Sequence, residues 1–177
     1  MGRVLHPTHL VYLLRDTKRL GPIGRCIIAE TLLAKMRGLL LTQRPPAGWG
    51  ALLRHCSSVH TWGMSFPIDI VFLKSVEPRK TNGNIGETAT KMLHLNEGTG
   101  LDLGALRPMR GSDSYYLVIS VLSRVSPWRL PQTCRGATDV LELVPLEPDE
   151  ETWLRGIQIE KGDLIEVRAQ AGMSGSR

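Results

Sequence analysis

The sequence predicts a mainly β fold of the α+β class, a compact β-sandwich or barrel with two helices. Three observations favour it: short runs of strand-forming residues recur along the chain, turn-forming residues separate them, and only two segments have helical features. With 177 residues and 42% hydrophobic content, the chain is long enough for one domain with a core and too short for two. We therefore expect a single domain over residues 1–177.

The strand predictions depend on apolar and β-branched composition between polar or glycine-containing turns. The first two strands, with the polar stretch 15–22 as their turn, predict a hairpin. The run 66–73 carries apolar side chains on both faces, with Asp69 inside it, whereas 138–144 alternates like a half-buried strand. The expected strands are 10–14, 25–29, 50–54, 66–73, 115–125, 138–144 and 164–167, the last after a turn at 161–163.

Two segments predict helices. Residues 31–41 hold strong helix formers without proline, with apolar side chains at helical spacing, and Thr31 or Glu30 can begin the helix. Gly38 would weaken this helix by about 1 kcal/mol relative to alanine, which close packing against a sheet would explain. A short helix at 148–155 begins with a proline and acidic residues and is followed by a glycine.

Two further segments lack this regular pattern. Residues 76–114 form a glycine-rich insertion with few strand formers, and its length suits either a disordered segment or a lid over residues 56–69. The tail 169–177 is rich in glycine and serine, and we expect it to be flexible.

Charge, hydropathy and cysteine content indicate the partners and the cellular location expected for the protein. The net charge of +5 comes from scattered basic residues without an aromatic-interleaved stripe, so a nucleic-acid partner is not expected. No run reaches the roughly 18–20 apolar residues of a membrane span, and the apolar run 10–14 is too short for a signal peptide. Three cysteines are an odd number, which disfavours a disulfide framework and predicts a reducing, cytoplasmic location.

The segment 56–73 is the predicted site. Cys56, His60, Trp62, Met64 and Asp69 place a thiol, an imidazole, an indole, a thioether and a carboxylate beside or within an apolar strand. The sequence has no phosphate-binding loop, dinucleotide fingerprint, G-x-S-x-G elbow or H-E-x-x-H pair, which excludes the common nucleotide-binding, α/β-hydrolase and zinc-protease classes. The sequence names no cofactor.

Three interpretations of the cysteines and histidine stay open. Cys56 and His60 are four residues apart and could bind Zn²⁺, with Cys134 or Asp69 completing the set. His60 could instead activate Cys56 or Cys134 for thiol chemistry. The third interpretation is structural, with the cysteines as small buried residues and His60 hydrogen-bonded in or near the core.

Arg37 and Asp69 would each be costly to bury alone, and we expect them to pair. In the functional alternative, Arg37 and Arg129 offer guanidinium groups to an anionic ligand, and Trp62 or Trp128 forms an apolar wall.

Several motifs occur in the order seen in a known family. The residues that carry the resemblance are 34–40, 60–73 (HTWGMSFPIDIVFL), 127–129, 134–137, 140–143, 156–157 and 161–163. On these residues the chain resembles the DUF192 (UPF0127) family over roughly 10–75 and 115–168, with 76–114 as an insertion. The resemblance implies a compact, mainly β fold whose biochemical function is not established, and many relatives look exported.

The sequence favours a non-catalytic domain that binds a small molecule or a protein segment. Its pocket would include His60, Trp62, Met64, Asp69 and Trp128, with the two arginines beside it. The alternative is a small metal- or thiol-dependent enzyme that uses Cys56, His60 and Asp69. A third class, an interaction domain for anionic partners, would show binding that weakens steeply with salt.

Overall fold

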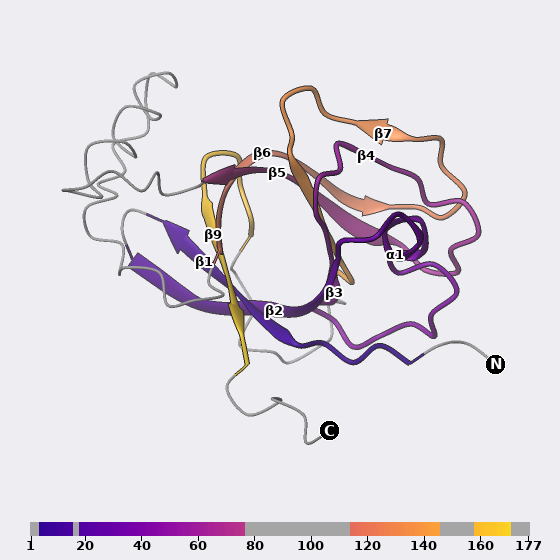
Figure 1. Cartoon of the computed structure of the whole chain (residues 1–177), viewed down its shortest axis with the longest axis horizontal. Coiled ribbons are helices and arrows are strands. Elements are labelled where there is room, and N and C mark those ends of the chain that lie inside the picture. The colour runs from indigo at the N-terminus through magenta and orange to yellow at the C-terminus, as the bar shows by residue number, and fades with distance from the viewer. Residues whose placement is uncertain (1–3, 16–17, 77–113, 146–157, 171–177) are drawn as a thin grey trace.

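The computed structural model describes residues 4–15, 18–76, 114–145 and 158–170 (Figure 1). In these ranges the elements are β1 (His9–Arg15), β2 (Lys18–Ala29), α1 (Leu32–Arg37), β3 (Trp49–Leu53), β4 (Ser58–Val59), β5 (Ile68–Val76), β6 (Ser114–Val125), β7 (Gln132–Thr133), β8 (Asp139–Leu143) and β9 (Leu164–Ala169). The mainly β prediction is confirmed. The expected helix at 148–155 lies outside the described residues.

Seven strands form a closed barrel in the order β1-β2-β3-β8-β5-β6-β9, and β4 pairs with β7 as a separate two-stranded sheet. The β1–β2 pair is the predicted antiparallel hairpin. β2 and β3 are parallel, so the chain must cross from one end of the barrel to the other between them. α1 belongs to this crossover, and Figure 1 shows it outside β3, on the same side of the barrel as β4 and β7.

The barrel interior is filled by one hydrophobic cluster with members from all seven barrel strands. These residues are Val11, Leu13, Ile23, Cys26, Leu52, Val71, Leu73, Tyr116, Val118, Leu141, Leu143, Ile165 and Val167. Cys26 is fully buried there, and burial raises the pKa of its thiol to about 12. It therefore has the structural role expected of a buried cysteine.

A second hydrophobic cluster lies on the outer face of β3, β8 and β5, beneath α1 and the β4 region. Its buried members are Leu5, Ala29, Leu39, Ala51, Leu53, Val59, Met64, Phe66, Ile68, Ile70, Phe72, Val140 and Val144. The alternation predicted along β5 is confirmed, since Ile68, Ile70 and Phe72 join this cluster while Val71 and Leu73 join the interior. The candidate site is built in this second layer.

α1 is shorter than the predicted helix 31–41. Its N-cap is Thr31, whose side-chain oxygen accepts a hydrogen bond from the Ala34 N–H at 3.2 Å. It ends at Gly38, which has a φ of 40°. A Cβ at Gly38 would lie 2.5 Å from Oε2 of Glu142 on β8, so glycine permits both the end of the helix and the predicted close approach to the sheet.

Other boundaries differ from the predictions. The polar stretch 15–22 is not all turn, because β2 already begins at Lys18 and continues past Gly21. Shifts in the register between β1 and β2 accommodate these turn-forming residues within the strand pair. All five residues of β8 are buried instead of half, because one face lines the barrel interior and the other lies under the second layer. Strand β9 extends to Ala169, and the Gln170 N–H donates to the Thr8 carbonyl.

Both irregular segments of the sequence fall mainly outside the described residues: 77–113 of the insertion, expected to be disordered or a lid, and 171–177 of the tail, expected to be flexible. The insertion connects β5 to β6, which pair antiparallel as far as Val76 and Tyr115. In the described part of the chain, no helix has the length and apolar character needed to cross a bilayer.

Candidate ligand-binding pocket

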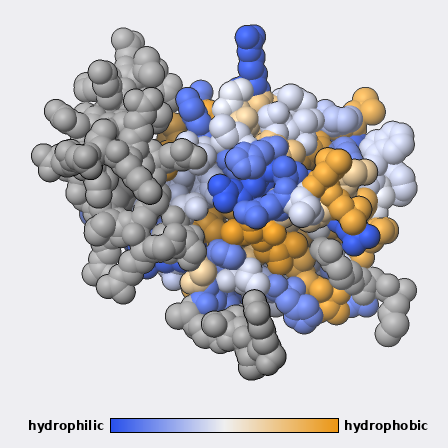
Figure 2. Space-filling model, in the orientation of Figure 1, coloured by the Kyte–Doolittle hydropathy of each residue, from blue (hydrophilic) through white to orange (hydrophobic). Residues whose placement is uncertain are grey.

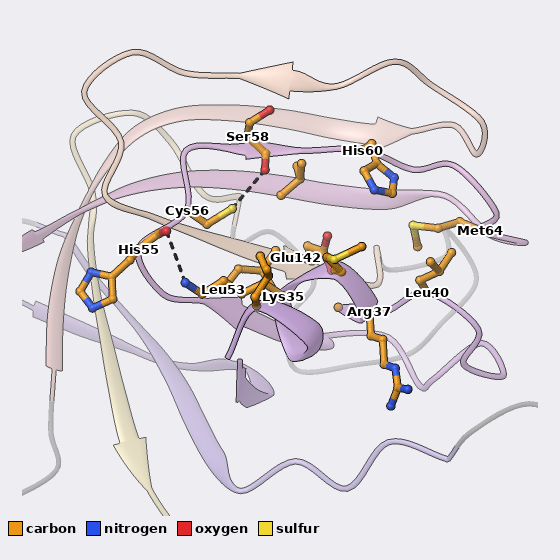
Figure 3. A pocket seen from close by; sticks show the side chains of 14 residues that line it. Lys35, Arg37, Leu40, Leu53, His55, Cys56, Ser58, His60, Met64 and Glu142 are labelled. Atoms are coloured by element: carbon orange, nitrogen blue, oxygen red, sulfur yellow. Dashed lines mark hydrogen bonds between the residues drawn. The ribbon is translucent and has the colours of Figure 1, made fainter. Parts of the chain in front are cut away.

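A cavity of about 280 Å³ lies between α1 and the outer wall of the barrel (Figure 3). Its lining comes from α1 and the turn after it, the end of β3, the segment that leads into and through β4, Met64, and one residue of β8. The lining residues are Leu32, Lys35, Met36, Arg37, Gly38, Leu40, Leu53, His55, Cys56, Ser58, Val59, His60, Met64 and Glu142. It is therefore a mostly apolar cavity with a few polar groups.

Glu142 is the buried acidic group of this cavity. On β8 it alternates with Leu141 and Leu143, which face the barrel interior, so its side chain lies on the outer face. It is 4% exposed, and its Oε2 accepts a hydrogen bond from the Leu39 N–H at 3.1 Å. Burial raises the pKa of Glu142 to about 7, and the hydrogen bond from Leu39 opposes this shift. Its carboxyl group can therefore exchange a proton near neutral pH.

Two of the three cysteine and histidine candidates line the cavity. The Cys56 thiol donates to the Ser58 carbonyl at 3.1 Å, and exposed His60 lies farther along the same segment (Figure 3). Cys134 does not line this cavity, and its N–H donates to the Ser57 carbonyl at 3.0 Å. No group of three or more histidine, cysteine or acidic side chains that could hold a metal ion occurs in the described ranges.

Met64 is buried and lines the cavity, but the two tryptophans lie elsewhere. Trp62 is 55% exposed and Trp128 is 67% exposed, and neither lines the cavity. Buried Thr61 joins their two loops: its hydroxyl donates to the Ser126 carbonyl at 2.8 Å and accepts from the Arg129 N–H at 2.9 Å. The Thr61 carbonyl also accepts from the Trp128 N–H at 2.8 Å. This anchoring role of Thr61 was not predicted.

Asp69 has a different partner from the predicted one. Its Oδ1 accepts a hydrogen bond at 2.7 Å from the N–H of Arg124, which has a φ of 50° at a register shift between β5 and β6. Burial raises the pKa of Asp69, and the hydrogen bond and charge of Arg124 oppose the shift. Asp69 therefore stabilises a β-bulge.

The prediction that Arg37 pairs with Asp69 is wrong, because the salt bridges between described residues do not include this pair. Asp69 alternates with the residues of β5 that face the outer layer, so it lies on the side of Val71. Arg37 belongs to α1 outside the barrel, is exposed, and directs its guanidinium away from the other side chains in Figure 3. The barrel wall therefore separates the two groups.

Of the predicted ligand-binding residues, Arg37, His60 and Met64 line the cavity, whereas Trp62, Asp69, Trp128 and Arg129 do not. Glu142 lines the cavity but was not among the residues predicted from the sequence. Its signal was an acidic residue within an apolar strand, the same feature that singled out Asp69.

Comparisons with known proteins support the fold. No family model and no curated protein matches this sequence. A solved structure of a protein of unknown function from Novosphingobium aromaticivorans DSM 12444 is similar, with a TM-score of 0.51 and 17% sequence identity. The match covers 88% of this chain and 82% of that chain. At this identity, the likeness shows a shared fold.

Proposed function

We propose that this chain is a non-catalytic binding domain that takes a small molecule in the cavity between α1 and the barrel wall. The observation that carries the proposal is the meeting of His60, Met64, Cys56 and Glu142 around one cavity of about 280 Å³. Small-molecule sites are typically concave and mostly apolar, with a few placed polar groups. This cavity has that composition.

We also propose that the chain is a divergent, cytoplasmic, single-domain member of the DUF192 family. The ordered motifs of the sequence and the compact barrel support this assignment. Three of the motifs line the cavity together: 34–40 supplies the end of α1 and the turn after it, 60–73 supplies His60 and Met64, and 140–143 supplies Glu142. The family assignment supplies no reaction.

A protein segment is the second candidate ligand, because large apolar side chains are exposed beside the cavity. On α1 these are Leu32, Leu33 and Met36. Figure 2 shows hydrophobic surface on the side of the molecule that carries α1. Exposed apolar patches of this kind often mark binding surfaces.

The enzyme alternative has less support in this geometry. A catalytic zinc site uses three protein ligands and an open coordination position, and the described residues supply no such group. The Cys56 Sγ lies 3.1 Å from the Ser58 carbonyl, and the described residues place no activating base against it. A binding role requires neither a metal nor a thiolate.

The chain offers an internal test of small-molecule binding. Cys56 and Cys134 are both partly exposed free thiols, but only Cys56 lines the cavity. We would screen small organic molecules by thermal shift and follow alkylation of both cysteines by mass spectrometry. A compound in the cavity should slow alkylation of Cys56 and leave Cys134 unchanged. If no compound that raises the melting temperature protects Cys56 selectively, the cavity is not the binding site.

A further inference from the structure

We propose that the cavity binds a small organic cation, a primary amine on a short apolar body, with its ammonium group against the carboxylate of Glu142. This inference rests on the proposed function and names the ligand class for the same cavity. Its basis is the position of Glu142, a buried acidic side chain that lines the cavity and has no cationic partner among the described residues.

The carboxylate has hydrogen-bonding capacity left for a ligand. An ionised carboxylate offers about four acceptor positions on its two oxygens. In the described part of the chain, Glu142 receives one hydrogen bond, from the Leu39 N–H to Oε2. Oε1 therefore has capacity for a donor, and the cavity is the space from which a ligand can supply it.

The basic groups around the cavity do not neutralise Glu142. Lys35 on α1 directs its Nζ to the His55 carbonyl at 3.5 Å, and the Arg37 guanidinium points away (Figure 3). The remaining titratable groups of the lining are Cys56 and the histidines His55 and His60. A buried charge without a partner is unfavourable, so either a proton or a cationic ligand stabilises this site.

The size and apolar lining of the cavity limit the body of the amine. At roughly 30 Å³ for each water-sized group, about 280 Å³ holds a ligand of about nine non-hydrogen atoms. Side chains such as Leu40, Leu53, Val59 and Met64 supply an apolar surface for its carbon atoms. Benzylamine fits this description, and benzyl alcohol is its neutral counterpart of equal size.

The first experiment compares these two probes by calorimetric titration at pH 8. Benzylamine should bind the wild-type protein more tightly than benzyl alcohol. Glu142→Gln should lower the affinity for benzylamine at least tenfold and change the affinity for benzyl alcohol by less than twofold. Glu160→Gln, which removes an equal charge from an exposed residue, is the matched control and should change neither. Equal binding of the two probes to the wild type, or an unchanged benzylamine affinity in Glu142→Gln, would overturn the proposal.

A second experiment uses the wild-type protein and does not depend on the variant. Because the proton and the ammonium group compete for Glu142, benzylamine should bind about tenfold more weakly for each pH unit below about 7 and release a proton there. His60→Gln should keep this dependence, which separates Glu142 from the nearby imidazole. A flat pH profile would refute the role of Glu142. If neither probe protects Cys56 and the screen finds no other ligand that does, the proposed function itself is wrong.

Discussion

Replacement of Glu142 by glutamine should change how the stability of the protein depends on pH. Glutamine has nearly the same shape and can still accept the hydrogen bond from the Leu39 N–H, but it cannot ionise. The substitution therefore removes one titration and keeps the packing between β8 and the turn after α1. This makes it a direct test of the buried carboxyl group.

The size of the effect follows from the two pKa values of Glu142. Between the ordinary value of 4.5 and the folded value of about 7, the folded protein keeps a proton that the unfolded chain has lost. The wild-type free energy of unfolding therefore falls as pH rises through this window and levels off above it. At about 1.4 kcal/mol per pH unit, the shift corresponds to a loss of about 3 kcal/mol.

Urea unfolding of the wild type and Glu142→Gln at pH 4, 5, 6, 7 and 8 measures this loss. Other titrating groups contribute equally to both proteins, so the difference between the two stabilities isolates Glu142. We expect this difference to shift by about 3 kcal/mol in favour of the glutamine variant between pH 4 and pH 8. If the stabilities of the two proteins change with pH in parallel, the pKa of Glu142 in the folded protein is ordinary. The carboxyl group would then not be buried without a partner.

Three further predictions test the local structure. Gly38→Ala should cost about 2–4 kcal/mol in urea unfolding, because the new Cβ would press on the carboxylate beneath it, whereas Gly136→Ala, with a φ of 90° and open space around it, should cost only about 1 kcal/mol. Equal losses would contradict the close approach. Thr61→Val removes two hydrogen bonds at nearly constant shape and should cost about 1–3 kcal/mol by the same assay; a neutral result would mean that the two loops are held elsewhere. In the folded protein, an alkylating reagent should modify Cys56 while Cys26 stays unmodified until denaturant is added, and mass spectrometry of digested samples would reveal early modification of Cys26.

Local sequence patterns predicted most strands of the barrel, because successive side chains of a strand point to opposite faces and their polarity indicates what each face packs against. The run around Val71 was predicted to be apolar on both sides, and each side does enter a different hydrophobic cluster. The same patterns could not decide between a sandwich and a barrel. Closure depends on the pairing of β1 with β9, for example Val11 with Val167, and no local pattern encodes a contact between such distant residues.

The candidate site was only partly predictable for a related reason. His60, Met64 and Cys56 were identified from their segment, and all three line the cavity. Asp69 and Glu142 look alike in sequence, since each is an acidic residue within an apolar strand. Their roles differ because Asp69 accepts a hydrogen bond from the backbone of a bulge, whereas Glu142 lines the cavity beneath α1. The two positions are distinguished only by what packs on each face of the barrel wall, which depends on the tertiary structure.

A second buried glutamate shows why the surroundings of Glu142 indicate a ligand. Glu166 on β9 is fully buried, yet Arg19 contacts it at 2.5 Å, Arg168 at 2.6 Å, and the Tyr115 hydroxyl donates to it at 3.1 Å. The same fold thus provides two cations and a hydroxyl group for one buried carboxylate, as the cost of burying charge requires. Glu142 receives a single backbone N–H from the described residues, and it also lines a cavity. Since an unpaired buried acid lowers the stability of the folded state, its position is better explained by a partner that arrives from solution than by a role in folding.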